Sequence, residues 1–335
     1  MTLTRWSFIG AVTLCGCSSS PAEPGSGAPP ATGSTTASAT ATTSIGPIPV
    51  AAGEEKTVCV VAPLDSDEDI VVSSMTANLD AGSHHLVVSK TTEDVNLTPT
   101  PCVTFSSILI GDAQPLIVVQ TPHGVQTFPD GVGVLLPAHQ RLRLEAHYLN
   151  SSTSAIEGNG SVTFAGTLAS KAPPYQAADT YIWGTGKISL AAQAQYTTPI
   201  VFQAGQAGTH LLSITTHEHR LGTLVQAWTS DSPGTRGEMI ANDSNWSEPV
   251  WHTLDKPVDF DGTNGVSLQC SWNNTTSDTV TFGESALDEM CFVLGFYYPS
   301  RGIDVCIDNR CVKRPKTDAG APPASAAPDS GTGAQ

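Results

Sequence analysis

Five of the nine histidines in this 335-residue chain are candidate metal ligands, and four of them lie in two short clusters. The five are His84 and His85, the single His147, and the pair His217 and His219, which flank one glutamate. In a β-strand, residues two apart point to the same face, so His217 and His219 would present two imidazoles side by side. Imidazole binds zinc, copper, iron and nickel, so the histidines alone predict a metal site without choosing the metal.

Met290 favours one of these metals. It stands beside a cysteine in the stretch LDEMC, and a thioether combined with two imidazoles favours copper, especially Cu(I). A methionine in an apolar run usually packs in a core, however, and a single histidine is usually a satisfied polar group. Each motif taken alone is therefore a weak indication of a metal site.

The segments that carry His147 and His217 have the two-residue periodicity of strands. In residues 141–148 the even-numbered positions are apolar, so His147 shares the opposite face with Arg143 and Glu145. In residues 212–217, Leu212 and Ile214 should pack inward and leave His217 on the other face.

His84 and His85 are adjacent, so they point to opposite faces of a regular strand. Joint metal binding by both side chains requires a strand end or a β-bulge. Gly82 and Ser83, which stand just before the two histidines, could supply one.

The fold class predicted from composition is all-β, with two consecutive antiparallel jelly-roll β-sandwich domains. The chain is 39% hydrophobic and 14% charged, with 30 glycines and 24 prolines, and clusters of turn residues separate short alternating runs. No amphipathic helix of 12 residues stands out. The net charge of −16 would repel phosphate backbones and anionic lipid headgroups, which excludes nucleic acid as a partner.

The first 20 residues resemble a bacterial export signal that ends in a lipobox. Arg5 precedes an apolar stretch and Gly16 precedes Cys17, so we expect residues 1–16 to be a lipoprotein signal peptide and Cys17 to be lipidated. An ordinary secretory signal is the alternative. Both interpretations place the body of the chain in an oxidising compartment. We expect an exported, membrane-anchored lipoprotein whose only membrane contact is the lipid.

Two low-complexity segments bound the predicted domains. Residues 17–46 are expected to form a flexible linker and residues 313–335 a disordered tail, because both are rich in Ser, Thr, Ala, Pro and Gly. We expect the first sandwich over residues 47–170 and the second over residues 176–312. The break falls near Pro173, in a stretch that holds two consecutive prolines.

Six cysteines remain in the body of the chain, and an oxidising compartment favours disulfides over a zinc site, for which no CxxC spacing occurs. Two lie in the first block and should pair with each other. In the second block the last two flank a turn-like stretch of four residues, which leaves the other two as partners. The expected disulfides are Cys59–Cys102, Cys270–Cys291 and Cys306–Cys311.

The order of these motifs resembles one family, the copper type II ascorbate-dependent monooxygenases, which include peptidylglycine α-hydroxylating monooxygenase and dopamine β-monooxygenase. The resemblance extends over about residues 47–299. It rests on DAGSHH at 80–85, LRLEAHYLN at 142–150, THEHRLG at 216–222 and EMC at 289–291, with YYP at 297–299. The second of these stretches is similar to the dopamine-hydroxylating branch.

The resemblance implies two coppers per chain, one in each sandwich. His84, His85 and His147 would hold the first, and His217, His219 and Met290 would hold the second and form the catalytic site. The family chemistry would be hydroxylation of a substrate C–H bond with dioxygen, with an electron from the first copper crossing an open cleft. Ascorbate or another one-electron donor would reduce both metals, and the partners would be dioxygen and a small organic substrate.

Three positions depart from the peptide-amidating branch of that family. Members of that branch hold the substrate carboxylate with an arginine two residues before the histidine pair and with polar residues two and four after the methionine. Here those positions are Thr215, Phe292 and Leu294. The departures favour an apolar or carboxylate-free substrate.

Two other functions are compatible with the motifs. One is a non-catalytic copper-binding surface lipoprotein for storage or delivery, and the other is an adhesion module with vestigial ligands, against which the complete ligand set argues. The remaining histidines are expected to be ordinary polar residues: His123, His139, His210 and His252.

Overall fold

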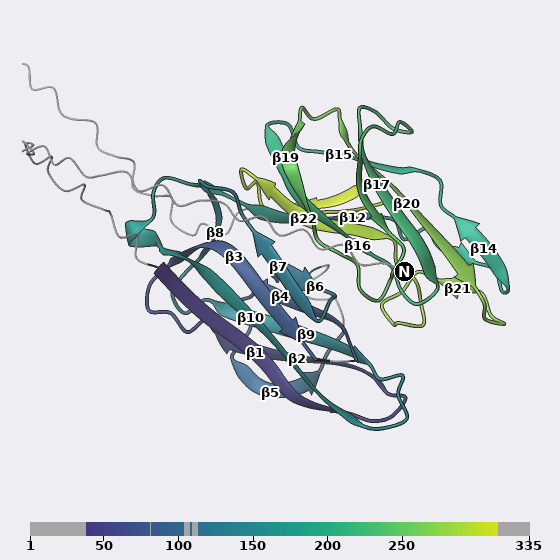
Figure 1. Ribbon diagram of the computed structural model, residues 1–335, viewed down its shortest axis with the longest axis horizontal. Coiled ribbons are helices and arrows are strands. Elements are labelled where there is room, and N and C mark those ends of the chain that lie inside the picture. Colours follow the sequence, from purple (N-terminus) through teal and green to yellow (C-terminus); the bar gives the residue numbers. More distant parts are fainter. Residues whose placement is uncertain (1–37, 81, 104–107, 109–112, 314–335) are drawn as a thin grey trace, which may run out of the picture. The chain divides into compact units, whose positions relative to one another are not determined.

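The structure is a computed structural model that describes residues 38–80, 82–103, 108 and 113–313 (Figure 1). The expected signal peptide, Cys17 and most of the linker and tail lie outside these residues. The named elements are β-strands and one short 3₁₀ helix, η1 (Ala169–Lys171), so the chain is all-β as predicted. In the part of the chain that is described, no helix has the length and apolar character to cross a membrane.

The first sandwich consists of two sheets whose facing residues form one hydrophobic cluster. One sheet has the order β1 (Ser38–Val50), β10 (Ile156–Leu168), β3 (Ile70–Leu79), β8 (Val132–Leu136) and β11 (Gln176–Ala177), and β7 (His123–Thr127) also pairs with β3. The other has the order β5 (Asn96–Pro101), β2 (Glu55–Pro63), β9 (Arg141–Leu149), β4 (Ser83–Lys90) and β6 (Gln114–Val119).

Strand β1 corrects the expected linker boundary at residue 46. Residues from Ser38 onward pair with β10, and Ala39, Ala41 and Ile45 point into the first core. The segment alternates buried and exposed residues, as an edge strand over a core should. Its composition of small residues hid this pattern, because alanine and threonine alternate too weakly in hydrophobicity to distinguish a strand from a linker.

The second sandwich has the same plan of two facing sheets around its own hydrophobic cluster. One sheet has the order β19 (His252–Phe260), β16 (Thr209–His217), β22 (Phe292–Tyr298), β12 (Asp179–Gly184), β23 (Asp304–Ile307) and β24 (Arg310–Lys313). The other has the order β14 (Ala194–Thr197), β20 (Gly265–Asn274), β17 (Gly222–Ser230) and β18 (Met239–Asp243), and β15 (Val201–Ala204) also pairs with β20. A small sheet joins β13 (Ser189–Leu190) to β21 (Val280–Thr281).

Two strand pairs are parallel, which corrects the expectation of purely antiparallel sheets. β11 pairs in parallel with β8 of the first sandwich, and β12 pairs in parallel with β23. The second sandwich therefore starts at β12, three residues later than expected. The connection through η1 falls where the proline pair had predicted a break.

Strand β22 is buried on both faces, because it serves the second core and the contact between the sandwiches. Val293 and Tyr297 belong to the core of the second sandwich. Phe292 and Leu294 belong to a third apolar cluster, together with Val87 of β4 and other residues of both sandwiches. The nearly continuous apolar sequence of β22 is typical of a strand covered on both sides.

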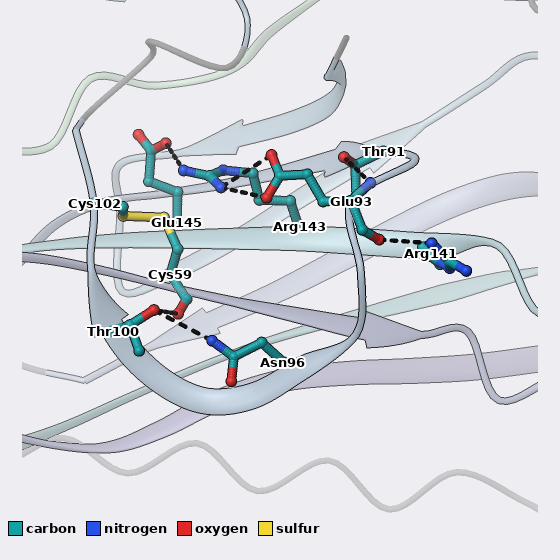
Figure 2. Close-up of polar contacts among 9 residues, drawn as sticks. All are labelled: Cys59, Thr91, Glu93, Asn96, Thr100, Cys102, Arg141, Arg143 and Glu145. Atoms are coloured by element: carbon teal, nitrogen blue, oxygen red, sulfur yellow. Dashed lines mark hydrogen bonds and ion pairs between the residues drawn. A yellow bond between two sulfur atoms is a disulfide. The ribbon is translucent and has the colours of Figure 1, made fainter. Parts of the chain in front are cut away.

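Three disulfides are present among the described residues, and their pairs are those expected from the sequence. They are Cys59–Cys102, Cys270–Cys291 and Cys306–Cys311. Figure 2 shows the first of them beside the polar face of β9. There Arg143 makes two hydrogen bonds with the Glu93 carboxylate, at 2.8 and 3.1 Å, and lies 3.9 Å from Glu145. Arg143 and Glu145 thus share the face on which His147 was predicted.

Candidate metal centre

His147 is held by the regular geometry of β9. Leu142, Leu144, Ala146 and Tyr148 enter the first core, so His147 points to the opposite face, as the sequence predicted. Its Nε2–H donates a hydrogen bond of 2.9 Å to the Oε1 atom of Glu55 on β2. This contact places the proton on Nε2 and leaves Nδ1 as the metal-binding nitrogen.

A β-bulge at His84 allows both adjacent histidines to face the same centre. The pairing of β4 with β9 shifts between Ser83 and His85, and Gly82 has a φ of 83°. This irregularity is the one that the sequence predicted for Gly82 and Ser83. In contrast, the residues that follow the bulge keep strict alternation, and Leu86 and Val88 enter the core.

His217 ends β16 and is oriented by a residue of the first sandwich. Gln120, which follows β6, donates from Nε2 to the Thr216 carbonyl oxygen at 2.9 Å, which fixes the orientation of the amide group. The Gln120 Oε1 atom therefore accepts the hydrogen bond from His217 Nδ1–H. With Nδ1 protonated, Nε2 is the nitrogen of His217 that can bind a metal.

His219 lies two residues past His217, beyond the end of β16. The pair was expected inside one strand, so this is a correction: the backbone leaves the sheet after His217. Leu212 also departs from expectation, because a register irregularity between Leu211 and Ser213 sends its side chain into the first core while Ile214 enters the second. His219 donates from Nδ1 to the Asp288 carbonyl oxygen at 3.1 Å, which leaves Nε2 for a metal.

The five histidines form a single cluster with two overlapping groups of three. In the first group, His84, His85 and His147 offer nitrogen atoms within 4.8 Å of one another, and in the second His84 does so with His217 and His219. The ring centroids of His84 and His217 are 5.7 Å apart. The expectation of an open cleft between the two sets of histidines is therefore wrong for this structure, because contacts between the sandwiches bring the two sets together.

The cluster is buried and its imidazoles are neutral. The five side chains are 0 to 5% exposed. Burial, followed by the neighbouring imidazoles, holds the pKa of His84, His85 and His217 well below its usual range. Burial also lowers the pKa of His219 to about 4. Neutral imidazole is the form that binds metals, so no proton has to leave these rings first.

Met290 lies next to this cluster in the apolar contact between the sandwiches. It is 3% exposed, and together with His217 it lines an apolar cavity of about 30 Å³. Phe292 and Leu294, the two residues that replace polar positions of the peptide-amidating branch, line the same cavity. A cavity of this size holds about one water molecule or a diatomic gas, so it does not accommodate an organic substrate.

Glu289 fixes the loop that carries His219 relative to Met290. Its carboxylate accepts hydrogen bonds from the backbone N–H groups of His219 and Leu221, at 3.0 and 2.8 Å, and from the indole of Trp272 at 2.8 Å. Burial raises the pKa of Glu289 to about 7, against the opposing effect of these hydrogen bonds. The glutamate beside Met290 thus holds the histidine pair.

The comparison with known families decides the relationship of the second sandwich. Residues 191–315 match the C-terminal domain of copper type II ascorbate-dependent monooxygenases, and this range contains His217, His219 and Met290. A human protein called "Putative DBH-like monooxygenase protein 2" is 30% identical over 94 residues, which are 27% of this chain and 19% of that protein. The second sandwich is therefore similar to the C-terminal domain of the copper type II ascorbate-dependent monooxygenases.

The chain spans about a fifth of the length of this human relative. Among solved structures, similar chains include the major capsid protein P2 of bacteriophage PM2, with a TM-score of 0.34 and 8% identity over 77% of this chain and 97% of that chain. Another is the broad bean stain virus structure, with a TM-score of 0.27 and 11% identity over 78% of this chain and 87% of that one.

The residues present fit the copper that the monooxygenase family requires. His84 Nε2, His147 Nδ1 and His219 Nε2 are buried atoms with no hydrogen-bond partner among the described residues. Leaving such an atom unsatisfied costs about 1–3 kcal/mol, and a bound metal would remove that cost. Copper accepts both donor sets: the three nitrogens of the first histidine group, and the two nitrogens of His217 and His219 with the Met290 thioether.

The residues that orient the candidate metal ligands were not predicted from the sequence. Gln120 and Glu55 are far from the histidine motifs in sequence, and nothing in their own segments signals a role. Glu289 is part of the EMC motif, from which only Met290 was predicted to have a role at the site. Of the histidines expected to be ordinary, His252 bonds to Asp243, which accepts a hydrogen bond from Thr216 beside His217.

Proposed function

We propose that this protein is a copper monooxygenase that hydroxylates a C–H bond of a small organic substrate, using dioxygen and an ascorbate-like reductant. The observation that carries the proposal is the buried cluster of five imidazoles, two of which, His217 and His219, lie in the range matched by the family. Three of them, His147, His217 and His219, have the proton fixed on one ring nitrogen by a hydrogen bond, which leaves the other nitrogen for a metal.

The proposed ligands are those implied by the family resemblance. His84, His85 and His147 would hold one copper, and His217, His219 and Met290 would hold the catalytic copper. Bound copper supplies one-electron redox chemistry and activates dioxygen. The chain's own contribution is to hold the imidazoles neutral, to exclude water by burial, and to place an apolar wall of Phe292 and Leu294 beside Met290.

A pocket of about 400 Å³ reaches His84 from the surface, and it is the place where we propose that substrate approaches. His84, Gln120, Trp246 and Ser83 are among its lining residues. The indole of Trp246 lies 5.7 Å from the His84 ring, measured between ring centroids. Pockets of this volume hold small organic molecules, with aromatic side chains as the main contact surface.

The proposal is tested with copper-loaded protein and labelled dioxygen. Protein reconstituted with two equivalents of copper would be incubated with ascorbate and ¹⁸O₂ against a panel of small phenethyl and acyl compounds, with zinc-loaded protein as the control. We expect an ascorbate-dependent product that carries one ¹⁸O atom, made only by the copper form. Copper cycling between its two oxidation states with no label in any compound of the panel would count against catalysis.

Copper storage or delivery without oxygen chemistry is a second candidate, and the burial of the cluster favours it. Five imidazoles that are at most 5% exposed are well placed to retain copper. A carrier would bind Cu(I) tightly and transfer it to a chelator slowly, with no ascorbate-dependent uptake of oxygen. The two functions are therefore separated by the labelling experiment above.

We also propose that the protein is exported and anchored to a bacterial membrane through a lipid on Cys17. The three disulfides support an oxidising compartment. Radiolabelled palmitate incorporation, compared between wild type and Cys17→Ala in a bacterial host, tests the anchor. Equal labelling of both proteins would contradict it.

A further inference from the structure

His84 lies nearly as close to the histidines of the second sandwich as to those of its own. Its ring centroid is 5.1 Å from that of His85 and 5.2 Å from that of His147, and it is 5.4 Å from His219 and 5.7 Å from His217. We propose that His84, His217 and His219 form a further metal site that spans both sandwiches and takes one ion that prefers nitrogen ligands, such as Zn²⁺.

The three side chains can offer suitable atoms at the same point. Their ligand nitrogens lie within 4.8 Å of one another, as three ligands around one ion require. His217 and His219 carry their protons on Nδ1, because Gln120 and the Asp288 carbonyl accept hydrogen bonds there. His84 Nε2 and His219 Nε2 are buried atoms without a hydrogen-bond partner in the described part of the chain.

The donor set distinguishes this site from the copper site that shares two of its histidines. A thioether favours Cu(I), whereas three imidazoles with one open position form a common tetrahedral set for zinc. Zinc should therefore choose His84 over Met290 as the third ligand. This inference does not depend on the proposed function, because zinc binding requires no oxygen chemistry.

The site excludes full copper loading, because a neutral imidazole has one lone pair for one metal. When His84 binds zinc together with His217 and His219, it cannot complete the set with His85 and His147. The bound ion would also link the two sandwiches, since His84 lies in β4 and His217 ends β16. A ligand that binds the folded state but not the unfolded state raises the melting temperature, so zinc should stabilise the protein against heat.

The test uses a background in which the copper sites are removed but the proposed ligands remain. The background protein carries His147→Ala and Met290→Leu, and His84→Ala or His85→Ala is then added to it. Zinc affinity and melting temperature are measured by calorimetry for all three proteins. The added changes are matched, because both residues are adjacent, buried and members of the first histidine group. We expect one zinc per chain in the background.

Losing a residue that only orients a ligand lowers metal affinity roughly 10–100-fold. Losing a ligand itself should lower the affinity by more than this. We therefore expect His84→Ala to weaken zinc binding by more than about 100-fold and to abolish the zinc-dependent rise in melting temperature. His85→Ala should change the affinity by less than about tenfold. Equal effects of the two changes, or zinc binding that survives His219→Ala, would overturn the proposal.

A second measurement avoids variants that fail to fold. Wild-type protein with ¹⁵N-labelled histidine is titrated with one equivalent of Zn²⁺ while the two nitrogens of each ring are followed by NMR. The site predicts that the metal-bound nitrogens belong to His84, His217 and His219, with Nε2 as the bound atom in the last two. Binding at His85 and His147 Nδ1 would contradict it.

Discussion

Gln120 of the first sandwich accepts a hydrogen bond from His217 of the second, so a proposed metal ligand is oriented by the other half of the chain. The same amide donates to the Thr216 carbonyl oxygen. Since Gln120 holds both the ring and the backbone beside it, the second metal site depends on the contact between the sandwiches.

Replacing Gln120 by leucine should weaken copper binding at the site of His217. The substitution removes the acceptor that keeps the proton on Nδ1, so the imidazole loses its fixed orientation. Loss of such a partner costs about 10–100-fold in metal affinity. Cu(I) affinity measured by competition with a chelator checks this. Gln126→Leu is the control, because Gln126 is also buried in the first sandwich but bonds to the Thr127 carbonyl. Equal affinities in the two variants would remove Gln120 from the site.

Glu55 makes the corresponding connection from the first metal site to the second sandwich. Its carboxylate accepts hydrogen bonds from His147 Nε2, from the Ala286 N–H at 2.7 Å and from the Ser285 hydroxyl. Glu55→Ala would leave the buried His147 Nε2 without its acceptor, so we expect a loss of about 1–3 kcal/mol in the free energy of unfolding.

Urea unfolding of Glu55→Ala and Glu54→Ala provides a matched comparison. The Glu54 side chain is 35% exposed and its ion pair with Lys56 is 3.4 Å long, and such a pair near the surface is worth about 0–1 kcal/mol. If the two variants lost the same stability, the role given to Glu55 would be wrong.

The disulfides should contribute unequally to stability. Cys270–Cys291 closes a loop with a sequence separation of 21, and Cys306–Cys311 closes one of 5. The chain-entropy account gives about 3 kcal/mol for the larger loop and about 1 kcal/mol less for the smaller. Paired cysteine-to-alanine variants, compared by urea unfolding, check this. A greater loss from the smaller loop would show that packing around it, and not chain entropy, dominates.

The all-β class, the disulfide pairs and the position of His147 could be predicted because they depend on local alternation and on counting. The bulge at His84 could be predicted because a glycine precedes two adjacent histidines that cannot share a face in a regular strand. These features follow from the backbone of one segment.

The close approach of the two sets of histidines could not be predicted from the sequence. It depends on how the two sandwiches pack. The only sign of this packing in the sequence of β22 is an apolar run, which a buried core strand would also show. Gln120 and Glu55 were missed for the same reason, because each acts across a contact between segments distant in sequence. The start of β1 was not predicted because alanine and threonine differ too little in hydrophobicity to show the alternation of a strand.

The number of coppers bound per chain shows whether the protein has two copper sites or one. We expect two coppers per chain in wild-type protein, with His147→Ala losing one and His217→Ala losing the other, because neither histidine belongs to the family's other ligand set. Elemental analysis after removal of weakly bound metal measures this. A single copper in the wild type, or the loss of both coppers in either variant, would contradict two separate ligand sets.

Met290 is the residue that most directly tests the claim of a copper monooxygenase. Isoleucine has a similar volume, so Met290→Ile should change the stability of the apolar contact by less than about 1.5 kcal/mol and remove only the thioether. We therefore compare ascorbate-coupled oxygen consumption by copper-loaded wild type and Met290→Ile, with near-ultraviolet circular dichroism to establish that both are folded. We expect oxygen consumption to fall to background in the variant, while the site of His84, His85 and His147 still fills with copper and is reduced. Unchanged oxygen consumption in folded Met290→Ile protein would contradict it.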